Sequence, residues 1–345
     1  MQVSLDDRLA DVQSKPSPRG AARPSAAHIG YLDGWRGLAI ALVLEAHFIN
    51  ILPFETGRMG VDVFFCLSGF LMSGLLFVKR QPLTLFYKRR ISRILPAFLL
   101  FVACIYIYAY SRQLKFSAAE VASTFLFLRT YLPIGVGIWE TGIPIGHLWS
   151  INIEEHCYIF MSLIVLFWRY RGHEGLMLFI AGVLCIGVGI IYVRLGKAAP
   201  PWGALGTEVA ASHLLISSGY RLLREKYQLK VPGYLPLLAI IAIPICYSEL
   251  APWWAKSLIS PFILAFAVNH LGQTYDWFKA ALSMPVLRYL GLWSYSIYLW
   301  QQPFYVYKSS FPGGPFMALV AAFAVSLLCF YAWEKPIRSW LNKYW

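Results

Sequence analysis

Charged residues, and acidic ones in particular, are scarce in this chain of 345 residues. Only 14% of its residues are charged, whereas 58% are hydrophobic, and an ordinary soluble domain carries about 25% charged residues. So little charge cannot cover the outside of a soluble protein with this much apolar surface. The same figures exclude a disordered, collagen-like or disulfide-scaffold protein. The composition therefore predicts an all-α polytopic membrane protein. The 13 Trp and 21 Tyr fit this class, because amphipathic rings gather at membrane surfaces.

Motifs for metal ligation, disulfide frameworks and secretion are also missing. The six cysteines lie in separate apolar stretches and form no CxxC pair, so we interpret them as packing residues. The histidines show no HExxH spacing, and no metal site or bound cofactor is predicted. Residues 1–30 are polar and contain no apolar run, which excludes a signal peptide. We expect this segment to be a flexible cytoplasmic tail.

Long apolar stretches dominate the rest of the chain. A transmembrane helix needs about 20 mostly apolar residues, or fewer where the helix is sheltered. Ten candidate spans satisfy this requirement: 32–52, 60–78, 94–111, 148–168, 175–194, 209–222, 234–250, 257–272, 289–308 and 316–333. Residues 121–133 are a doubtful eleventh span.

The distribution of basic residues decides the orientation. With ten spans and both termini in the cytoplasm, 21 of the 30 Lys and Arg lie in inside segments and 8 in outside segments. This excess is what positive-inside insertion predicts. A full span at 121–133 would reverse the membrane orientation of every later segment. We therefore interpret residues 121–133 as an interfacial or re-entrant piece of an outer segment, 112–147. The net charge of +13 then faces the anionic cytoplasmic leaflet, and nucleic acid is not needed as a partner.

Ionisable residues inside membrane spans mark functional sites or buried pairs. The first span holds Arg36 and His47, which are eleven residues apart. Eleven residues are close to three helical turns, so both side chains are expected on one helix face, about 16 Å apart along the axis. A histidine in a span can instead bond a neighbouring helix, and both interpretations of His47 fit the sequence.

Further polar residues are expected at the depth of His47. The second span contains Asp62 and Ser68, and the fourth contains Glu154 and Glu155. A histidine beside a carboxylate suits an oriented general base, and Ser68 suits a nucleophile that lacks a base spaced to it in the sequence. The alternative roles are a helix-start cap for Asp62, close packing for Ser68, and a structural partner for one glutamate.

A basic loop precedes the third span and contains Arg89, Arg90 and Arg93. Arginine forks match phosphate geometry, so the loop could bind a phosphorylated donor. A topology anchor that touches lipid phosphates explains the same residues, and from physics alone it is the simpler explanation.

Six sequence blocks, in order, resemble the acyltransferase 3 family of bacterial integral-membrane O-acyltransferases. They are YLDGWRGLAIALVLEAHF, GVDVFFCLSGFL, FYKRRISRILPAF, HLWSINIEEHCYIF, LGLWSYSIYLWQQPF and WEKPIR. The similarity extends over residues 31–338, which we assign to one transmembrane domain, followed by a short cytoplasmic tail at 339–345. The resemblance implies a ten-helix core in the bacterial inner membrane, an activity on the hydroxyls of sugars, and acyl-CoA as donor substrate.

The resemblance also implies roles for particular residues. It matches Arg36 and His47 to an arginine and an essential histidine, Arg90 and Arg93 to a basic motif on the acyl-CoA side, and Glu154 and Glu155 to an acidic pair. Many members have a histidine where this chain has Gln301, which cannot accept a proton at neutral pH. Some members append an extracytoplasmic hydrolase-like domain, and none is expected in a chain that ends at Trp345.

These observations predict a membrane O-acyltransferase that moves an acyl group, acetyl by default, to a cell-surface or exported glycan. Acyl-CoA would bind at the cytoplasmic face, with Arg36 near the entrance and the basic loop on its phosphates. His47, oriented by Glu154 or Glu155, would take the proton of the sugar hydroxyl. A covalent acyl relay, a flippase for lipid-linked glycans and an inactive assembly partner are the alternatives. The acceptor, acyl chain length and oligomeric state stay open.

Overall fold

The structure is a computed structural model that describes residues 30–168, 171–196, 205–252 and 254–345. The predicted tail at 1–30 lies outside the described residues except for Gly30. The α-helices are α2 (Gly30–Leu44), α3 (Thr56–Ser73), α4 (Leu83–Ser111), α5 (Ala118–Phe125), α6 (Leu148–Trp168), α7 (Glu174–Arg194), α8 (Thr207–Ala210), α9 (Ser212–Tyr227), α10 (Tyr234–Cys246), α11 (Ser260–His270), α12 (Asp276–Leu282), α13 (Pro285–Val306), α14 (Gly314–Cys329) and α15 (Lys335–Tyr344). Extended pairing within the described ranges is limited to one isolated bridge between Phe54 and Ser248. The fold is therefore all-helical, as predicted.

Five helical segments are long and apolar enough to cross a membrane. They are Thr56–Val78, Leu83–Ser111, Leu148–Trp168, Glu174–Arg194 and Gly314–Tyr344. Each of the other five predicted spans also coincides with a helix, but these helices are shorter or more polar. The chain is thus a multi-pass membrane protein, and the count of ten spans stays a prediction.

Four helices end or begin in a π-helical turn, which widens the helix by one residue per turn. These turns are Glu45–Ile49, Gly74–Val78, Ala255–Ile259 and Phe330–Glu334. Such turns occur frequently at functional sites. The first of them contains His47, so the segment from Arg36 to His47 is not one regular α-helix, as the prediction of a shared face assumed.

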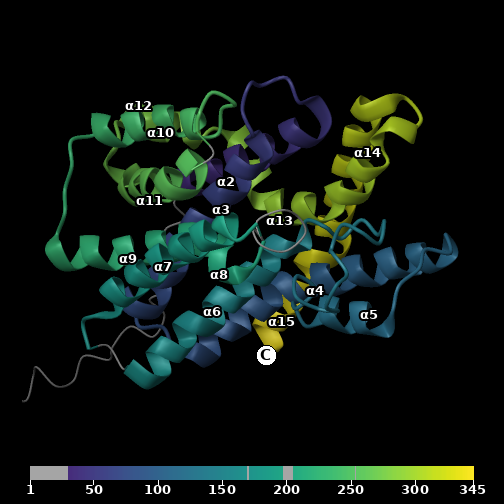
Figure 1. The fold of residues 1–345 in the computed structure, drawn as a ribbon, viewed down its shortest axis with the longest axis horizontal. Coiled ribbons are helices and arrows are strands. Elements are labelled where there is room, and N and C mark those ends of the chain that lie inside the picture. The colour runs from purple at the N-terminus through teal and green to yellow at the C-terminus, as the bar shows by residue number, and fades with distance from the viewer. Residues whose placement is uncertain (1–29, 169–170, 197–204, 253) are drawn as a thin grey trace, which may run out of the picture.

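Glycines allow the central helices to approach closely. Figure 1 shows α2 beside α3 and α13 at the centre, with α10 to α12 at one end and α4, α5 and α14 at the other. A Cβ on Gly37 of α2 would lie 2.0 Å from the carbonyl oxygen of Leu287, and one on Gly291 of α13 would lie 1.9 Å from that of Asp33. Small residues at crossings permit this backbone packing in membranes. The packing fixes Arg36, on α2, against α13.

Helix α4 begins at Leu83, eleven residues before the predicted span at 94. Its first turns carry the basic residues, which hydropathy alone assigns to a loop. An α-helix places residues four apart on the same face, so Arg89 and Arg93 share a face. The predicted cytoplasmic loop is therefore a helical extension that presents its arginines in fixed register.

The doubtful segment 121–133 contains only the end of α5, which is 8 residues long. At 1.5 Å per residue this helix measures about 12 Å, too short to cross a bilayer. The segment is nevertheless folded: Arg129 is fully buried, pairs with Glu120 at 3.0 Å and donates to the carbonyl of Val136. The helix length therefore agrees with the prediction of a short piece that does not span the membrane.

Candidate active site

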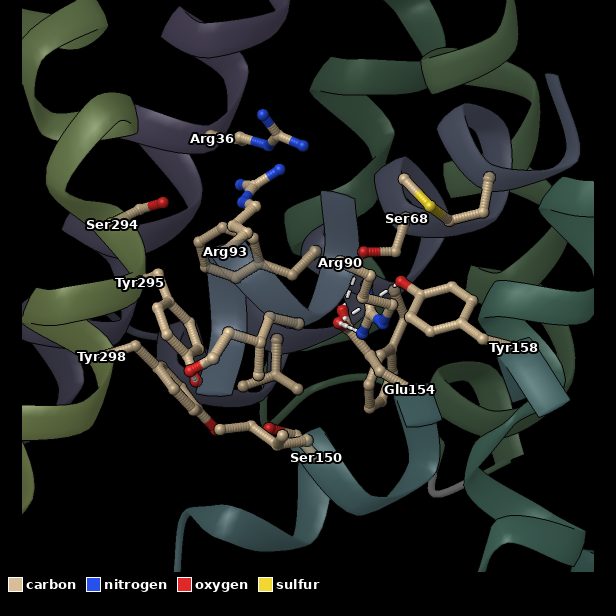
Figure 2. A pocket seen from close by; sticks show the side chains of 16 residues that line it. Arg36, Ser68, Arg90, Arg93, Ser150, Glu154, Tyr158, Ser294, Tyr295 and Tyr298 are labelled. Carbon is tan, nitrogen blue, oxygen red and sulfur yellow. Dashed lines mark hydrogen bonds and ion pairs between the residues drawn. The ribbon is translucent and has the colours of Figure 1, made fainter. Parts of the chain in front are cut away.

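A polar cavity lies between five helices, and most of the predicted site residues line it. Figure 2 shows Arg36 from α2, Ser68 from α3, Arg93 from α4, Glu154 from α6 and Tyr298 from α13 around the same space. The cavity has a volume of about 100 Å³, and its wall also includes apolar side chains of α3 and α4. A space with a few convergent polar groups in an apolar wall is typical of a small-molecule site.

Glu154 accepts hydrogen bonds from two side chains that line this cavity. Its Oε1 accepts from Ser68 Oγ at 2.7 Å, and its Oε2 accepts from the Tyr158 hydroxyl at 3.3 Å. Tyr158 lies one turn further along α6, and Ser68 comes from α3. The structure therefore gives Ser68 a carboxylate partner that no spacing in the sequence revealed.

The arginine Arg90 is held by the acidic pair. Its Nε and Nη2 donate to Glu155 Oε1 at 3.0 and 2.7 Å, and its Nη2 lies 3.5 Å from Glu154 Oε2. Its guanidinium also covers the ring of Tyr158, 3.6 Å from the ring centroid. A cation held by two carboxylates and a ring face has little left to offer a phosphate, so Arg90 differs from the other arginines of the predicted basic motif.

A second cavity, of about 500 Å³, adjoins the first and is strongly basic. The two cavities share Met72, Arg90 and Arg93 in their walls. The remaining lining residues of the second cavity are Leu75, Gln81, Leu85, Phe86, Lys88, Arg89, Arg338 and Asn342. We refer to it below as the basic vestibule. The basic vestibule and the inner cavity together suit a ligand with an anionic end and a long uncharged arm. The anionic end would lie among the cations of the vestibule, and the arm would lie in the inner cavity.

Arg36 enters the inner cavity from α2, beside Arg93 (Figure 2). Its Nη1 is 3.7 Å from Asp33 Oδ1, a loose ion pair on the same helix. Thus the structure brings Arg36, Ser68, Arg90, Arg93 and Glu154 to one cavity. Arg89 lines only the vestibule, and Glu155 takes part through its contact with Arg90.

His47 lies outside the lining of the inner cavity and makes a different set of contacts. Its Nδ1 is 2.7 Å from Gln301 Oε1, and its ring stacks on Tyr305 at 4.0 Å between centroids. Lys308 Nζ donates to the His47 carbonyl oxygen. The prediction that Glu154 or Glu155 orients this ring is wrong for this structure, because Gln301 occupies the orienting position and the glutamates bond Ser68 and Arg90.

The end of the inner cavity lies one helical turn from the partner of His47. Tyr298, three residues before Gln301 on α13, lines the cavity, and its hydroxyl lies 2.7 Å from Ser150 Oγ. The same hydroxyl donates to the carbonyl oxygen of His147 at 3.0 Å. The bond between Ser150 and Tyr298 joins α6 to α13 at the wall of the inner cavity.

Asp62 belongs to another cluster and not to the cavity. It is fully buried, and its Oδ2 accepts from Arg58 Nε and from the Tyr247 hydroxyl, both at 2.9 Å. His213 Nδ1 lies 3.6 Å from its Oδ1. The structure therefore does not place Asp62 beside His47 or the glutamates. Its role as a helix-start cap is not seen either, because its partners are side chains.

Sequence reasoning missed three residues of this region. Gln301 was noted only for what it cannot do, Tyr298 was not singled out, and Arg338 was counted only as a basic residue of the C-terminal segment. Each is brought to the site by helix packing over long sequence separations. Within the described ranges, no group of three His, Cys, Asp or Glu side chains is arranged to hold a metal ion.

Comparison with known proteins shows the family of this chain. The model of the acyltransferase 3 family, described as an acyltransferase domain, matches residues 29–334. The chain belongs to the acyltransferase 3 family. It is 26% identical over 356 residues to a peptidoglycan O-acetyltransferase OatA of Listeria monocytogenes, an alignment that covers 92% of this chain and 57% of the relative. It is 26% identical over 324 residues to an O-acetyltransferase OatA of Staphylococcus aureus, covering 83% of this chain and 52% of the relative.

The chain therefore spans little more than half the length of these relatives. No solved structure matches it. The family is described as an acyltransferase domain, and both of these relatives are named O-acetyltransferases.

Proposed function

We propose that this protein transfers an acetyl group, or another acyl group, from acyl-CoA to a hydroxyl of a cell-surface glycan across the bacterial inner membrane. The observation that carries the proposal is the shared wall of the two cavities. The basic vestibule offers cations to the phosphates of the donor, and the inner cavity offers a polar path for the pantetheine arm and its thioester. Arg93 lines both cavities and marks the boundary between nucleotide and arm.

The proposed topology has ten spans with both termini in the cytoplasm. Contacts between helix ends support it, because they fall into two sets. On the cytoplasmic side of the proposed topology, Lys226 in the last turn of α9 bonds the carbonyl of Gly172 before α7. On the outer side, Lys308 after α13 bonds the carbonyl of His47, and Tyr131 bonds Glu208 at the start of α8. The two partners of each contact lie on the same side of the membrane only if an even number of spans separates them in the chain. The ten-span topology meets this condition for both sets.

His47 is the proposed general base. Because Gln301 Oε1 can only accept, His47 Nδ1 carries the hydrogen, and Nε2 keeps its lone pair free for a proton. Gln301 is itself oriented, since its Nε2 faces the carbonyl of Tyr298 and Oε1 of Gln302, both at 3.4 Å. A histidine tautomer is set in this way by the bond that its other nitrogen makes.

In the proposed step, the sugar hydroxyl oxygen attacks the thioester carbonyl carbon while His47 Nε2 takes the hydroxyl proton. A C–O bond forms and the C–S bond breaks. The CoA thiolate leaves and receives the proton from the imidazolium, which restores the neutral ring. For this transfer, the acyl group must reach His47 from the inner cavity, whose lining residue Tyr298 lies one helical turn before Gln301 on α13.

The test is transfer by the purified protein. Proteoliposomes would receive acetyl-CoA labelled in the acetyl group together with glycan fragments, and both labelled glycan and free CoA would be measured. The proposal predicts equal amounts of glycan ester and released CoA. Glycan uptake without acetyl transfer would contradict it and would instead indicate a transporter. Measurement of surface-glycan O-acetyl groups in cells with and without the gene would identify the acceptor.

A further inference from the structure

The C-terminal helix α15 forms one wall of the basic vestibule. It packs along the first turns of α4, where Ser92 Oγ donates to Asn342 Oδ1 at 3.0 Å. Just before it, Trp333 Nε1 donates to the carbonyl of Pro96 at 2.9 Å. These two bonds hold the end of the chain against α4, although about 250 residues separate the partners.

Two pairs of vestibule residues are thereby opposed. Arg338 and Asn342 are four residues apart on α15, and Arg89 and Arg93 are four residues apart on α4. Residues four apart share a helix face. Each pair therefore lies on one face of its helix, and all four residues line the vestibule.

Arg93 and Arg338 make no hydrogen bond or ion pair with any part of the chain that the structure describes. Both are partly buried, whereas two other partly buried arginines are paired, Arg58 with Asp62 and Arg90 with Glu155. The acidic residue nearest in sequence to Arg338 is Glu334, which accepts from Ser296 Oγ instead.

Arg93 and Arg338 repel each other in a partly desolvated cavity whose lining contains no carboxylate, and Glu334, which attracts both, balances at most one of the two charges. An anionic ligand removes this repulsion, and guanidinium forks match the oxygens of phosphate. Arg90 is less suited to this purpose, because the acidic pair already balances its charge.

We infer that Arg338 of the C-terminal helix, together with Arg93 of α4, binds the phosphates of the nucleotide part of the acyl donor. The inference rests on the proposed function. It moves one phosphate contact from Arg90 to Arg338, which lies 248 positions further along the chain. Phospholipid head groups of the cytoplasmic leaflet carry the same phosphate chemistry. The wall shared with the inner cavity favours the soluble donor, whose arm needs a route inward.

The experiment compares two ligands and two variants. Binding of CoA and of pantetheine, which lacks the nucleotide and its phosphates, would be measured by calorimetry on the full chain in uncharged detergent. Arg338→Ala should weaken CoA binding about ten-fold or more, as expected for a lost charge-assisted bond, and leave pantetheine binding unchanged. The matched control is Lys343→Ala on the same helix, because Lys343 does not line the vestibule and lies over the Tyr344 ring. It should change CoA binding less than two-fold.

Several results would overturn the inference. They are unchanged CoA binding by Arg338→Ala, an equal loss of CoA and pantetheine binding, or a loss no larger than that of Lys343→Ala. A loss that occurs only when anionic phospholipid is added would assign Arg338 to lipid head groups. If the Arg338→Ala variant does not fold, two measurements replace it. Arg338→Gln should weaken CoA binding and leave pantetheine binding unchanged. In the wild type, CoA binding must weaken as the salt concentration rises, and pantetheine binding must not. A wild-type protein that binds neither ligand would contradict the proposed function itself, and the inference with it.

Discussion

His47 Nδ1 and Gln301 Oε1 lie 2.7 Å apart, although 254 residues separate them in the chain. A carboxylate in the position of Gln301 would attract a proton to the ring and would stabilise the imidazolium. The neutral amide fixes the tautomer without adding charge. The pair therefore suits a histidine that begins each cycle neutral, with Nε2 as its free acceptor.

This relationship predicts the effects of two substitutions at Gln301. Gln301→Met removes the orienting bond and should lower kcat by roughly three- to ten-fold, the value of one hydrogen bond. Gln301→Glu should keep activity but move the acid limb of the pH profile to higher pH, because an anion beside the ring favours its protonated form. Full pH profiles of both variants provide the measurement. The control is Asn269→Met, since Asn269 is also buried and its amide bonds Ser217 and Ala265, away from His47 and Gln301. A Gln301→Met variant with wild-type rate and profile would show that the bond is only structural.

Arg90 and Arg93 should behave differently, although they belong to one sequence motif. Arg93→Ala should raise the KM for acetyl-CoA and leave the protein stable, because Arg93 has no partner among the described side chains. Arg90→Ala should lower stability by about 2 kcal/mol, between the values for surface and fully buried pairs, since it leaves Glu155 unpaired. Thermal unfolding in detergent measures this effect.

The double variant Arg90→Ala with Glu155→Gln supplies the control for that pair. Removal of both charges should restore most of the lost stability, because no buried carboxylate then lacks a partner. Equal stability of the single and double variants would contradict the assignment of Arg90 to the acidic pair.

Ser68 offers a test between direct transfer and a covalent relay. Its hydroxyl bonds Glu154, but this carboxylate also accepts from Tyr158 and lies 3.5 Å from Arg90 Nη2, so it is shared among three donors and is not dedicated to Ser68. We predict direct transfer: Ser68→Ala should retain at least a tenth of the activity. Wild-type protein incubated with labelled acetyl-CoA and no acceptor should carry no label on Ser68. Acetyl-Ser68 in a mass spectrum, formed at the rate of turnover, would refute this prediction.

The topology is tested with reporter fusions at Ser111 and His173. Ser111 ends α4, and His173 precedes α7, with only α6 as a long apolar helix between them. The fusions should report opposite sides of the membrane. Reports from the same side would make residues 121–133 a true span and would invert the later part of the chain.

The sequence predicted individual helices well and the site incompletely. The span predicted at 148–168 coincides with α6, because an uninterrupted apolar stretch between polar ends leaves little freedom. Helix α4 was predicted to begin too late, because hydropathy cannot distinguish a charged helical extension from a loop. The partners of Asp62 and the bond from Gln301 to His47 could not be predicted, since they depend on how helices distant in sequence rotate and pack. The π turn at Glu45–Ile49 has no hydrophobic pattern that reveals it.

The central claim is that His47 accepts the proton of the glycan hydroxyl, and His47→Gln tests it most directly. Glutamine keeps much of the bulk and some hydrogen bonding of the ring but cannot accept a proton at neutral pH. Transfer of labelled acetyl from acetyl-CoA would be measured for wild-type, His47→Gln and His47→Ala proteins matched for expression and CoA binding. The account predicts that both variants lose about 10²- to 10⁴-fold in rate, the range for a general base. A glutamine variant that transfers at a near-normal rate would show that His47 only packs against α13, and would contradict the mechanism.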